Sequence, residues 1–273
     1  MFQCVDGYGI NNGVMNLTTA GTPGTDANRI SDASAFAGYL IYKLKYKNLT
    51  ITPGLRYESI SLGRKDYGKN DVSRQGFDLS TRENKVNVWI PGMGFNYNFN
   101  RVSIFGGIHK GFSPPTSKEG ELPEESINYE LGSRFSFGNF SGELVGFFND
   151  YSNLLGSDLA ATGGTGSLEQ FNAGEVDVTG LEVLLNYNAL SNHKKLRLPI
   201  TFAYTYTNTE FQSSFDSPND IWGEVTKGDE MPYIPKHQFN AMISLEHHSY
   251  ELNLSGRYNG AFRTKAGSGS IPT

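Results

Sequence analysis

The feature that most constrains this chain is a repeated unit of about ten residues in which apolar and polar side chains alternate. In the stretch 36–46, for example, Phe36, Leu40 and Tyr42 fall on one face of an extended strand. Tyr39 and Lys43 fall on the opposite face. Each unit ends alternately in a short turn or a long polar loop. Strands with two such different faces, joined in this order, are typical of a β-barrel that spans a membrane.

The alternation predicts about ten antiparallel strands, a number within the known range of membrane barrels. The expected spans are 34–46, 49–61, 85–98, 101–112, 126–137, 140–152, 171–188, 196–211, 237–247 and 250–262. A ten-residue strand that rises about 3.3 Å per residue and is tilted by about 45° covers roughly 23 Å, close to the apolar band of an outer membrane. The predicted fold class is therefore all-β, an antiparallel transmembrane β-barrel.

The connections between these strands give the barrel a direction. The short ones are expected at Lys47-Asn48, Asn98-Arg101, Gly138-Asn139, Ala189-Lys195 and His248-Ser249. The long ones are expected at 1–33, 62–84, 113–125, 153–170 and 212–236, and after Phe262. Because barrel turns on the periplasmic side are short and loops on the outer side are long, we place the long loops outside the cell. Aromatic residues cluster at the strand ends, as they do at membrane interfaces.

The faces of the strands can be assigned from their charges. A charge at the lipid midplane would cost roughly 2 to 4 kcal/mol, so the charged faces are expected to line the lumen. The predicted lumen-lining residues are Arg56, Glu58, Glu130, Arg134, Glu182, Asn240 and Arg257. Proline lacks the amide proton that a ladder needs, so we expect local bulges at Pro53-Gly54 and at Pro91-Gly92.

Composition excludes several other classes of protein. The formal net charge is -5, and Lys and Arg form no stripe, so no nucleic-acid partner is expected. The single cysteine, Cys4, permits no internal disulfide, and no metal site is expected because no Cys and His cluster has zinc-ligand spacing. No linker divides the chain, so residues 1–273 are expected to form one domain. The first thirty residues lack a secretory signal, which suggests a truncated chain.

Several segments resemble the barrel of TonB-dependent outer-membrane receptors, and most closely the ferric-citrate group. They are TPGLRYE at 52–58, KGFSPP at 110–115, PEESINYELG at 123–132, FNDYSNLL at 148–155, VTGLE at 178–182, PYIPKHQFN at 232–240 and GAFRTKAG at 260–267. Each segment is weak alone, but their order and spacing cover nearly the whole chain.

The resemblance implies a barrel of about 22 strands with a plug inside it. It implies TonB-dependent import of a scarce nutrient, most specifically a ferric siderophore or ferric citrate, across the outer membrane of a Gram-negative bacterium. The chain would be a partial barrel domain, without the TonB box, the plug and the last strands. Its partners would be outer-membrane lipid and lipopolysaccharide, the ferric chelate, and TonB acting through the missing plug and N-terminus. The ferric chelate is the transported ligand, and no cofactor is expected.

Three residues are candidates for ligand binding. His109 is expected to point inward near the outer end of its strand, where it either lines the lumen or contacts a ligand. Arg64 and Lys65 belong to a basic stretch that could attract an anionic siderophore or a lipopolysaccharide phosphate, or could be ordinary charged loop.

The rival hypothesis is a complete ten-stranded outer-membrane barrel enzyme of the protease or lipase type. Such an enzyme needs a base within hydrogen-bond reach of an acid or a nucleophile. His109, Ser113 and either Asp150 or Asp229 are the candidates for that role, and nothing in the sequence brings them together. The leading hypothesis requires no catalytic residue.

Overall fold

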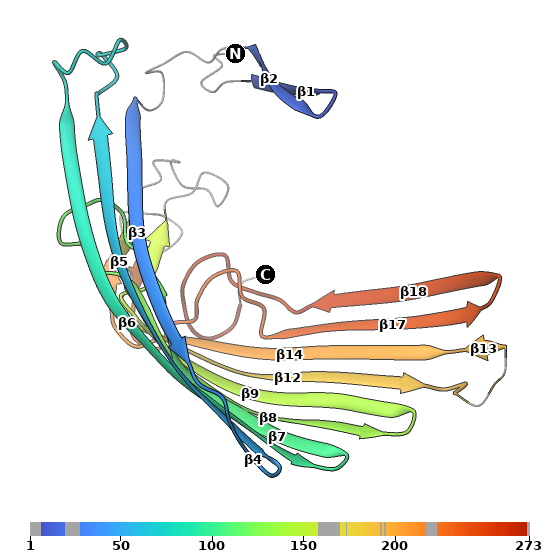
Figure 1. Ribbon diagram of the computed structural model, residues 1–273. Coiled ribbons are helices and arrows are strands. Elements are labelled where there is room, and N and C mark those ends of the chain that lie inside the picture. Colours follow the sequence, from blue (N-terminus) through green and yellow to red (C-terminus); the bar gives the residue numbers. More distant parts are fainter. Residues whose placement is uncertain are drawn as a thin grey trace. The chain divides into compact units, whose positions relative to one another are not determined.

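The computed structural model describes residues 7–19, 28–157, 170–172, 174–191, 193, 195–216 and 223–271, and its regular elements are strands (Figure 1). The strands are β1 Gly7–Asn11, β2 Val14–Thr19, β3 Arg29–Ile41, β4 Leu44–Tyr46, β5 Leu49–Asp66, β6 Ser80–Phe99, β7 Val102–Ser113, β8 Glu124–Phe137, β9 Phe140–Ser152, β10 Leu155–Ser157, β11 Gln170–Asn172, β12 Val176–Asn188, β13 Leu196–Arg197, β14 Pro199–Phe211, β15 Phe215–Asp216, β16 Glu224–Val225, β17 His237–His247 and β18 Tyr250–Asn259. The described residues contain no helix that is long and apolar enough to span a membrane.

The main sheet confirms the predicted strand count and the all-β, antiparallel fold class. It has 12 strands in the order β13-β17-β14-β12-β9-β8-β7-β6-β5-β3, with β18 paired to β17 and β4 paired to β5. Two of the 12 are continuations of a neighbour across a short break, β4 of β3 and β13 of β14, so 12 − 2 = 10 long strands remain. The strands pair antiparallel, and each strand from β5 to β8 pairs with the next one along the chain.

The predicted short turns are also found. Two-residue turns join β4 to β5, β6 to β7, β8 to β9 and β17 to β18. The first residue of three of them, Lys47, Asn100 and Gly138, has a positive φ of 50° to 63°. Asparagine side chains tie neighbouring turns together, because Asn48 Nδ2 donates to the carbonyl of Asn98 at 2.8 Å and Asn139 Nδ2 donates to that of Asn188 at 3.1 Å.

Several predicted boundaries are wrong. The expected loop 62–84 is shorter, because β5 continues to Asp66 and β6 begins at Ser80. Backbone pairing does not need apolar side chains, so both strands extend beyond the residues that show the apolar alternation. The span 171–188 starts instead at Val176, with β11 paired to β10 and residue 173 outside the described residues. The first long strand begins at Arg29 rather than at residue 34. The last long strand ends at Asn259 rather than at residue 262. The expected loop 1–33 also contains the β1–β2 hairpin, whose Asn12-Gly13 turn has φ values of 51° and 77°.

Neither proline interrupts its own strand. Both β5 and β6 are continuous through the expected bulge positions Pro53-Gly54 and Pro91-Gly92. The strand opposite Pro53 is interrupted instead at Tyr42-Lys43, although the Tyr42 amide still donates to the Pro53 carbonyl at 3.0 Å. The ladder between β6 and β7 stops at Gly92, beside Pro91. At Pro53 the missing amide removes the return bond to Tyr42.

The chain divides into two compact units, which we describe separately. The first takes the described residues of Met1–Ala37, Glu58–Val88 and Pro115–Glu121. It contains the loop-end arms of β5 and β6, on which Ile60, Val86 and Val88 are buried. The loop after β5 has its own buried polar centre: the Asp71 carboxylate accepts the amides of Gln75 and Gly76 at 2.8 and 2.6 Å.

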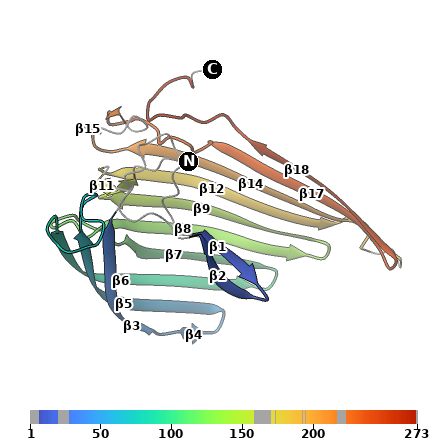
Figure 2. The ribbon, with the colours of Figure 1, turned by 90° about the horizontal axis from the view of Figure 1, so that it is seen from above.

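The second unit takes the described residues of Gly38–Tyr57, Trp89–Pro114 and Leu122–Thr273. Its long strands β7, β8, β9, β12, β14, β17 and β18 lie side by side in one continuous sheet (Figure 2). Cross-strand partners keep one alternation through the sheet, so each strand contributes to one apolar face and one polar face. Strand β9, whose faces the sequence leaves unclear, is resolved by its register: Glu143 pairs with Arg134 on the polar face, and Leu144, Gly146 and Phe148 lie on the apolar face.

Four phenylalanine–glycine pairs hold neighbouring strands in register. The pairs of direct cross-strand partners are Phe95 with Gly106, Phe105 with Gly132, Phe135 with Gly142, and Phe147 with Gly180. In each pair the ring lies where a glycine side chain would begin, and three of the rings come within 2.6 to 2.8 Å of that point. A ring over a glycine compensates for the packing that the glycine lacks.

Candidate functional site

The polar face of the sheet carries the predicted lumen-lining residues. They lie on β5 (Arg56, Glu58), β8 (Glu130, Arg134), β12 (Glu182), β17 (Asn240) and β18 (Arg257). Glu58 belongs to the first unit and the others to the second. Asn240 and Arg257 are direct cross-strand partners, and Arg134 forms an ion pair with Glu143 while its guanidinium lies 4.1 Å from the centre of the Phe105 ring. The alternation therefore places these residues of the second unit on one common face.

A hollow of about 700 Å³ lies on the polar face of the second unit. Its lining includes Arg56 from β5, His109 from β7 and Glu130 from β8. Three of the predicted site residues therefore meet at one place. The hollow exists because glycines of adjacent strands carry no side chain there, and Gly94 and Gly107 are direct partners. An added Cβ at Gly92 would lie 3.1 Å from the His109 Cβ, so a larger residue there would crowd His109.

The three ligand-binding candidates differ in their surroundings. His109 is exposed at the hollow, and its backbone carbonyl accepts a hydrogen bond from Asn128 Nδ2 at 3.3 Å. Arg64 and Lys65 lie in the β5 arm of the first unit rather than in a loop. Arg64 Nη2 pairs with Asp66 Oδ2 at 2.9 Å, and this hydrogen bond holds the pKa of the Asp66 carboxyl below its usual value. Lys65 is exposed.

The structure does not assemble the catalytic set of the rival hypothesis. His109 and Ser113 are four residues apart on the same strand, β7. Asp150 alternates onto the apolar side of β9, opposite Ile127 and Asp177. Asp229 is used by its own turn, where its Oδ2 accepts the Thr226 amide at 2.9 Å. Among the described residues, these groups therefore do not form a base beside a nucleophile.

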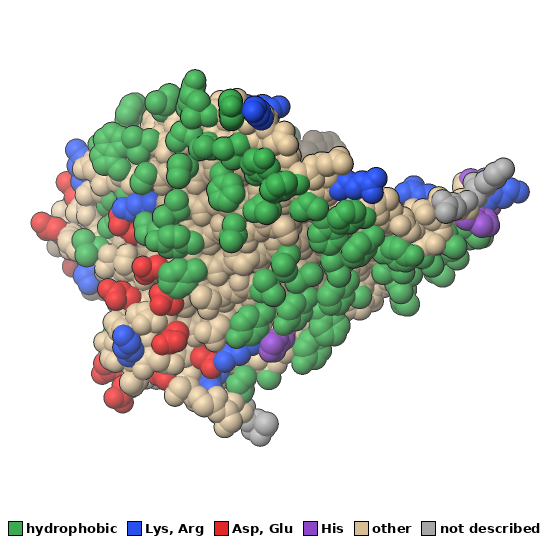
Figure 3. Space-filling view, turned by 90° about the horizontal axis from the view of Figure 1, so that it is seen from below, with side chains coloured by type: hydrophobic (Ala, Val, Ile, Leu, Met, Phe, Trp, Pro, Cys, Tyr) green, Lys and Arg blue, Asp and Glu red, His purple; other side chains and the backbone are tan. Residues whose placement is uncertain are grey.

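The opposite face of the sheet is apolar and open. Leu131, Leu252 and Leu254 expose 61%, 66% and 71% of their surface there. Figure 3 looks onto this face and shows hydrophobic side chains spread over it, with acidic side chains gathered toward one end. Aromatic rings pack together at the short-turn end, as the sequence predicts: Phe135 lies 5.3 Å from Phe140. Exposed apolar surface of this extent marks a face that contacts something other than water.

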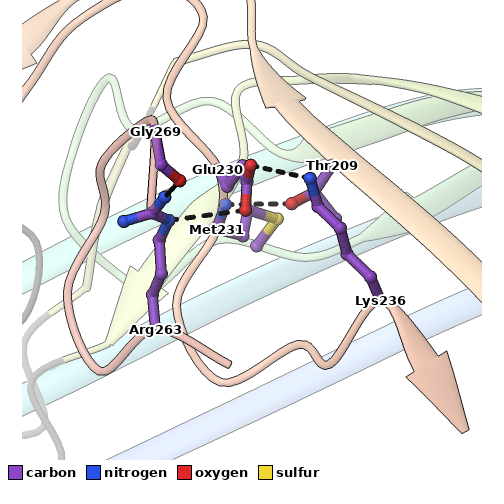
Figure 4. Close-up of polar contacts among 6 residues, drawn as sticks. All are labelled: Thr209, Glu230, Met231, Lys236, Arg263 and Gly269. Carbon is purple, nitrogen blue, oxygen red and sulfur yellow. Dashed lines mark hydrogen bonds and ion pairs between the residues drawn. The ribbon is translucent and has the colours of Figure 1, made fainter. Parts of the chain in front are cut away.

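A charged network fixes the connections at the loop end of β14, β17 and β18 (Figure 4). Glu230 accepts from Lys236 Nζ at 2.8 Å and from Arg263 Nε at 3.4 Å. Arg263 is 7% exposed and also donates to the Gly269 carbonyl, while the Met231 amide donates to Thr209 Oγ1 at 2.9 Å. Burial alone would raise the pKa of the Glu230 carboxyl, but the two cations outweigh it and hold that pKa below its usual value.

Sequence reasoning missed two parts of these sites. The glycines that line the hollow could have been predicted, because Gly92 and Gly94 are two residues apart in the sequence and therefore share a face. The role of Arg263 could not have been predicted, because its partner Glu230 lies 33 positions away in a different connection.

Comparison with known proteins gives the family. A family model described as TonB dependent receptor-like, beta-barrel matches residues 5–272. The ferric citrate transporter FecA in its unliganded form is 21% identical, with a TM-score of 0.63, over 85% of this chain and 33% of FecA. The siderophore receptor PiuA from Acinetobacter baumannii is 16% identical, with a TM-score of 0.64, over 90% of this chain and 35% of PiuA.

The ferric-catecholate import receptor Fiu from E. coli K12 is 15% identical, with a TM-score of 0.60, over 96% of this chain and 38% of Fiu. The chain thus spans about a third of the length of these receptors. At these identities the structures show a shared fold, and the family model shows the membership. The chain belongs to the TonB-dependent receptor β-barrel family, and its sheet is part of the antiparallel barrel wall of a Gram-negative outer-membrane protein.

Proposed function

We propose that the protein takes part in TonB-dependent import of a ferric chelate, a ferric siderophore or ferric citrate, across the outer membrane. The match of the family model to residues 5–272 carries this proposal. It is supported by structural neighbours that are described as a ferric citrate transporter, a siderophore receptor and a ferric-catecholate import receptor. In this proposal the chain supplies part of the barrel wall and of the extracellular loops.

The two faces of the sheet suit this role. The apolar face, with its exposed leucines, contacts lipid, and the polar face lines the lumen. There Arg56, Glu130 and His109 present hydrogen-bonding groups around the 700 Å³ hollow, where they contact the plug, lumen water or the passing ligand. No bond is made or broken in the ligand by these residues, so the wall acts as a scaffold.

The outer loops take part in ligand capture in this proposal. Lys65 is exposed on the β5 arm, whereas Arg64 is engaged with Asp66 and helps to shape that arm. A cationic side chain on an outer loop raises the local concentration of an anionic chelate. TonB supplies the energy from the periplasmic side, through the plug.

Uptake measurements test the proposal. The complete receptor that contains these residues is expressed in a strain without other ferric-chelate receptors, and uptake of iron-labelled ferric citrate and of ferric siderophores is followed with and without TonB. We expect uptake of a ferric chelate that requires both the receptor and TonB, while binding of the chelate to the cell surface persists without TonB. Uptake that is independent of TonB would contradict the proposal, and TonB-dependent uptake of haem, cobalamin or a glycan alone would refute the ferric chelate as ligand.

A further inference from the structure

A small apolar cluster lies at the loop end of the polar face of the second unit. Its centre is Val176, Phe211 and Val225, which expose 0%, 0% and 1% of their surface. Val176 and Phe211 are direct cross-strand partners on β12 and β14, and they alternate onto the polar face. Met231 and Ala266 pack against this centre from two different outer connections. The cluster therefore fastens both connections to the wall.

Met231 joins this cluster to the charged network of Glu230 (Figure 4). Its amide donates to Thr209 Oγ1 at 2.9 Å, and Thr209 is 5% exposed. The preceding residue, Glu230, binds the two cations of that network. The Met231 side chain is itself partly buried against the cluster. One residue thus holds the segment 226–236 to the wall both through its backbone and through its side chain.

The thioether of Met231 can be changed by a mild oxidant, unlike the hydrocarbon side chains around it. Hydrogen peroxide transfers one oxygen atom to the sulfur and leaves as water, so the sulfur is oxidised by two electrons and the peroxide is reduced. The sulfoxide oxygen is a hydrogen-bond acceptor, and the side chains of Val176, Phe211 and Val225 carry no donor. The oxidised side chain must therefore leave the cluster or stay in it without a hydrogen bond.

Two other methionines lie in different surroundings. Met93 on β6 exposes 53% of its surface, and Met242 on β17 exposes 43%. Met93 alternates onto the apolar face, and Met242 shares the polar face with Asn240. A sulfoxide on either side chain would remain at an open surface and would disrupt no packed cluster. Among the methionines whose surroundings the structure describes, oxidation at Met231 alone would release a connection.

We propose that Met231 is an oxidation site that controls the outer connections. Conversion of its thioether to the sulfoxide by a peroxide releases the segments 226–236 and 260–269 from the loop end of β12 and β14. The change is reversible, because a sulfoxide can be reduced back to the thioether. Its effect on uptake rests on the proposed role of these loops in ligand capture, whereas the oxidation and the release do not depend on what is transported.

Oxidation of the complete receptor tests the proposal. The purified receptor in detergent is treated with hydrogen peroxide, peptide mass spectrometry measures the sulfoxide at each methionine, and amide hydrogen exchange measures protection in 226–236 and 260–269. Met231→Leu keeps a side chain of similar volume that cannot form a sulfoxide. Met242→Leu is the matched control at an open surface. All variants carry Cys4→Ser, so that no oxidised thiol of this chain contributes, and heat-modifiable migration verifies that each is folded.

We expect the sulfoxide at Met231 to lower the protection of both segments about tenfold, the order that follows when a buried polar group lacks its hydrogen bond. Met242→Leu should respond like the parent protein, and Met231→Leu should keep its protection in peroxide. Methionine sulfoxide reductases should restore the oxidised parent. Complete oxidation of Met231 without loss of protection would overturn the proposal, as would an equal loss in Met231→Leu. A Met231 that stays reduced while Met242 is oxidised would overturn it as well.

Discussion

At the scale of single residues, Glu230 organises the loop end of the last three long strands. Its carboxylate joins Lys236, just before β17, to Arg263, just after β18. The backbones of the same two connections also pair, because Glu230 and Gly267 form an isolated antiparallel β-bridge. Two connections that are distant in the sequence are thereby held together outside the membrane-spanning part of the strands, where the loops take part in the proposed ligand capture.

Arg263→Ala is expected to loosen these connections. The side chain is 7% exposed and makes charged hydrogen bonds, each of which contributes about 1.5 to 3 kcal/mol. Amide hydrogen exchange in the complete receptor should show lost protection in 226–236 and 260–269. Arg257→Ala, which removes an exposed arginine of β18, is the control and should leave those amides protected. Unchanged exchange in Arg263→Ala would show that the network does not hold the loops.

The same loops should open in acid. The pKa of Glu230 is lowered in the folded protein, because Lys236 and Arg263 outweigh the opposing effect of burial. Its contribution to stability is therefore fully present above the unfolded-state pKa and is lost as the pH falls through the folded-state pKa. Protection of the loop amides, measured relative to their intrinsic exchange rate at each pH, should fall across that acidic range in the wild type. Glu230→Gln should be less protected at neutral pH and show a weaker fall; an identical pH profile of protection for both would contradict this role.

At the scale of elements, phenylalanine–glycine pairs fix how the strands register. A one-residue slip would move every side chain to the wrong face, and a ring that fits only over a glycine makes such a slip costly. The pairs lie on both faces: Phe135 with Gly142 on the apolar face, and Phe105 with Gly132 on the polar face beneath Arg134.

Gly132→Val should destabilise the sheet by about 1 to 3 kcal/mol, the usual range for overpacking. The added Cβ would lie 2.6 Å from the Phe105 ring and 2.8 Å from the Leu144 carbonyl oxygen. Gly146→Val on the adjacent strand is the matched control, because its nearest neighbour is at 3.9 Å. Denaturant unfolding of the refolded receptor in detergent compares the two. Equal midpoints would show that the pairs carry no register information.

At the scale of the whole molecule, the sheet has two edges. Among the described residues, β18 pairs with β17 alone and β3 with β5 alone. Each edge leaves backbone amides and carbonyls unpaired, and an open edge is not stable in lipid, where no water can satisfy them. The wall is therefore complete only when further strands close the barrel.

Residues 1–273 expressed alone are accordingly expected to aggregate rather than insert. Refolding into detergent or vesicles, followed by electrophoresis with and without heating, measures this directly. The complete receptor is the positive control and should migrate as a compact, heat-modifiable band. A compact band from residues 1–273 alone would contradict the prediction and show that the edges can be satisfied by this chain.

The sequence by itself determined the strands, the turns and the two faces, because alternation and turn chemistry are local properties of the chain. Spans such as 140–152 and 237–247 coincide with β9 and β17 for that reason. The proline positions could be recognised from the sequence, but the break opposite Pro53 falls on the partner strand, at Tyr42-Lys43. The long arms of β5 and β6 were missed because pairing continues there without an apolar pattern.

Only the tertiary structure decided which residues meet across strands. Arg56, His109 and Glu130 share a hollow because β5, β7 and β8 lie close together in one sheet, and Glu230 reaches Arg263 across 33 positions of sequence. The difference between the covered Gly142 and the open Gly146, four residues apart on one strand, depends on which side chain the neighbouring strand places over each. Such contacts follow from register, and register is a property of the assembled sheet.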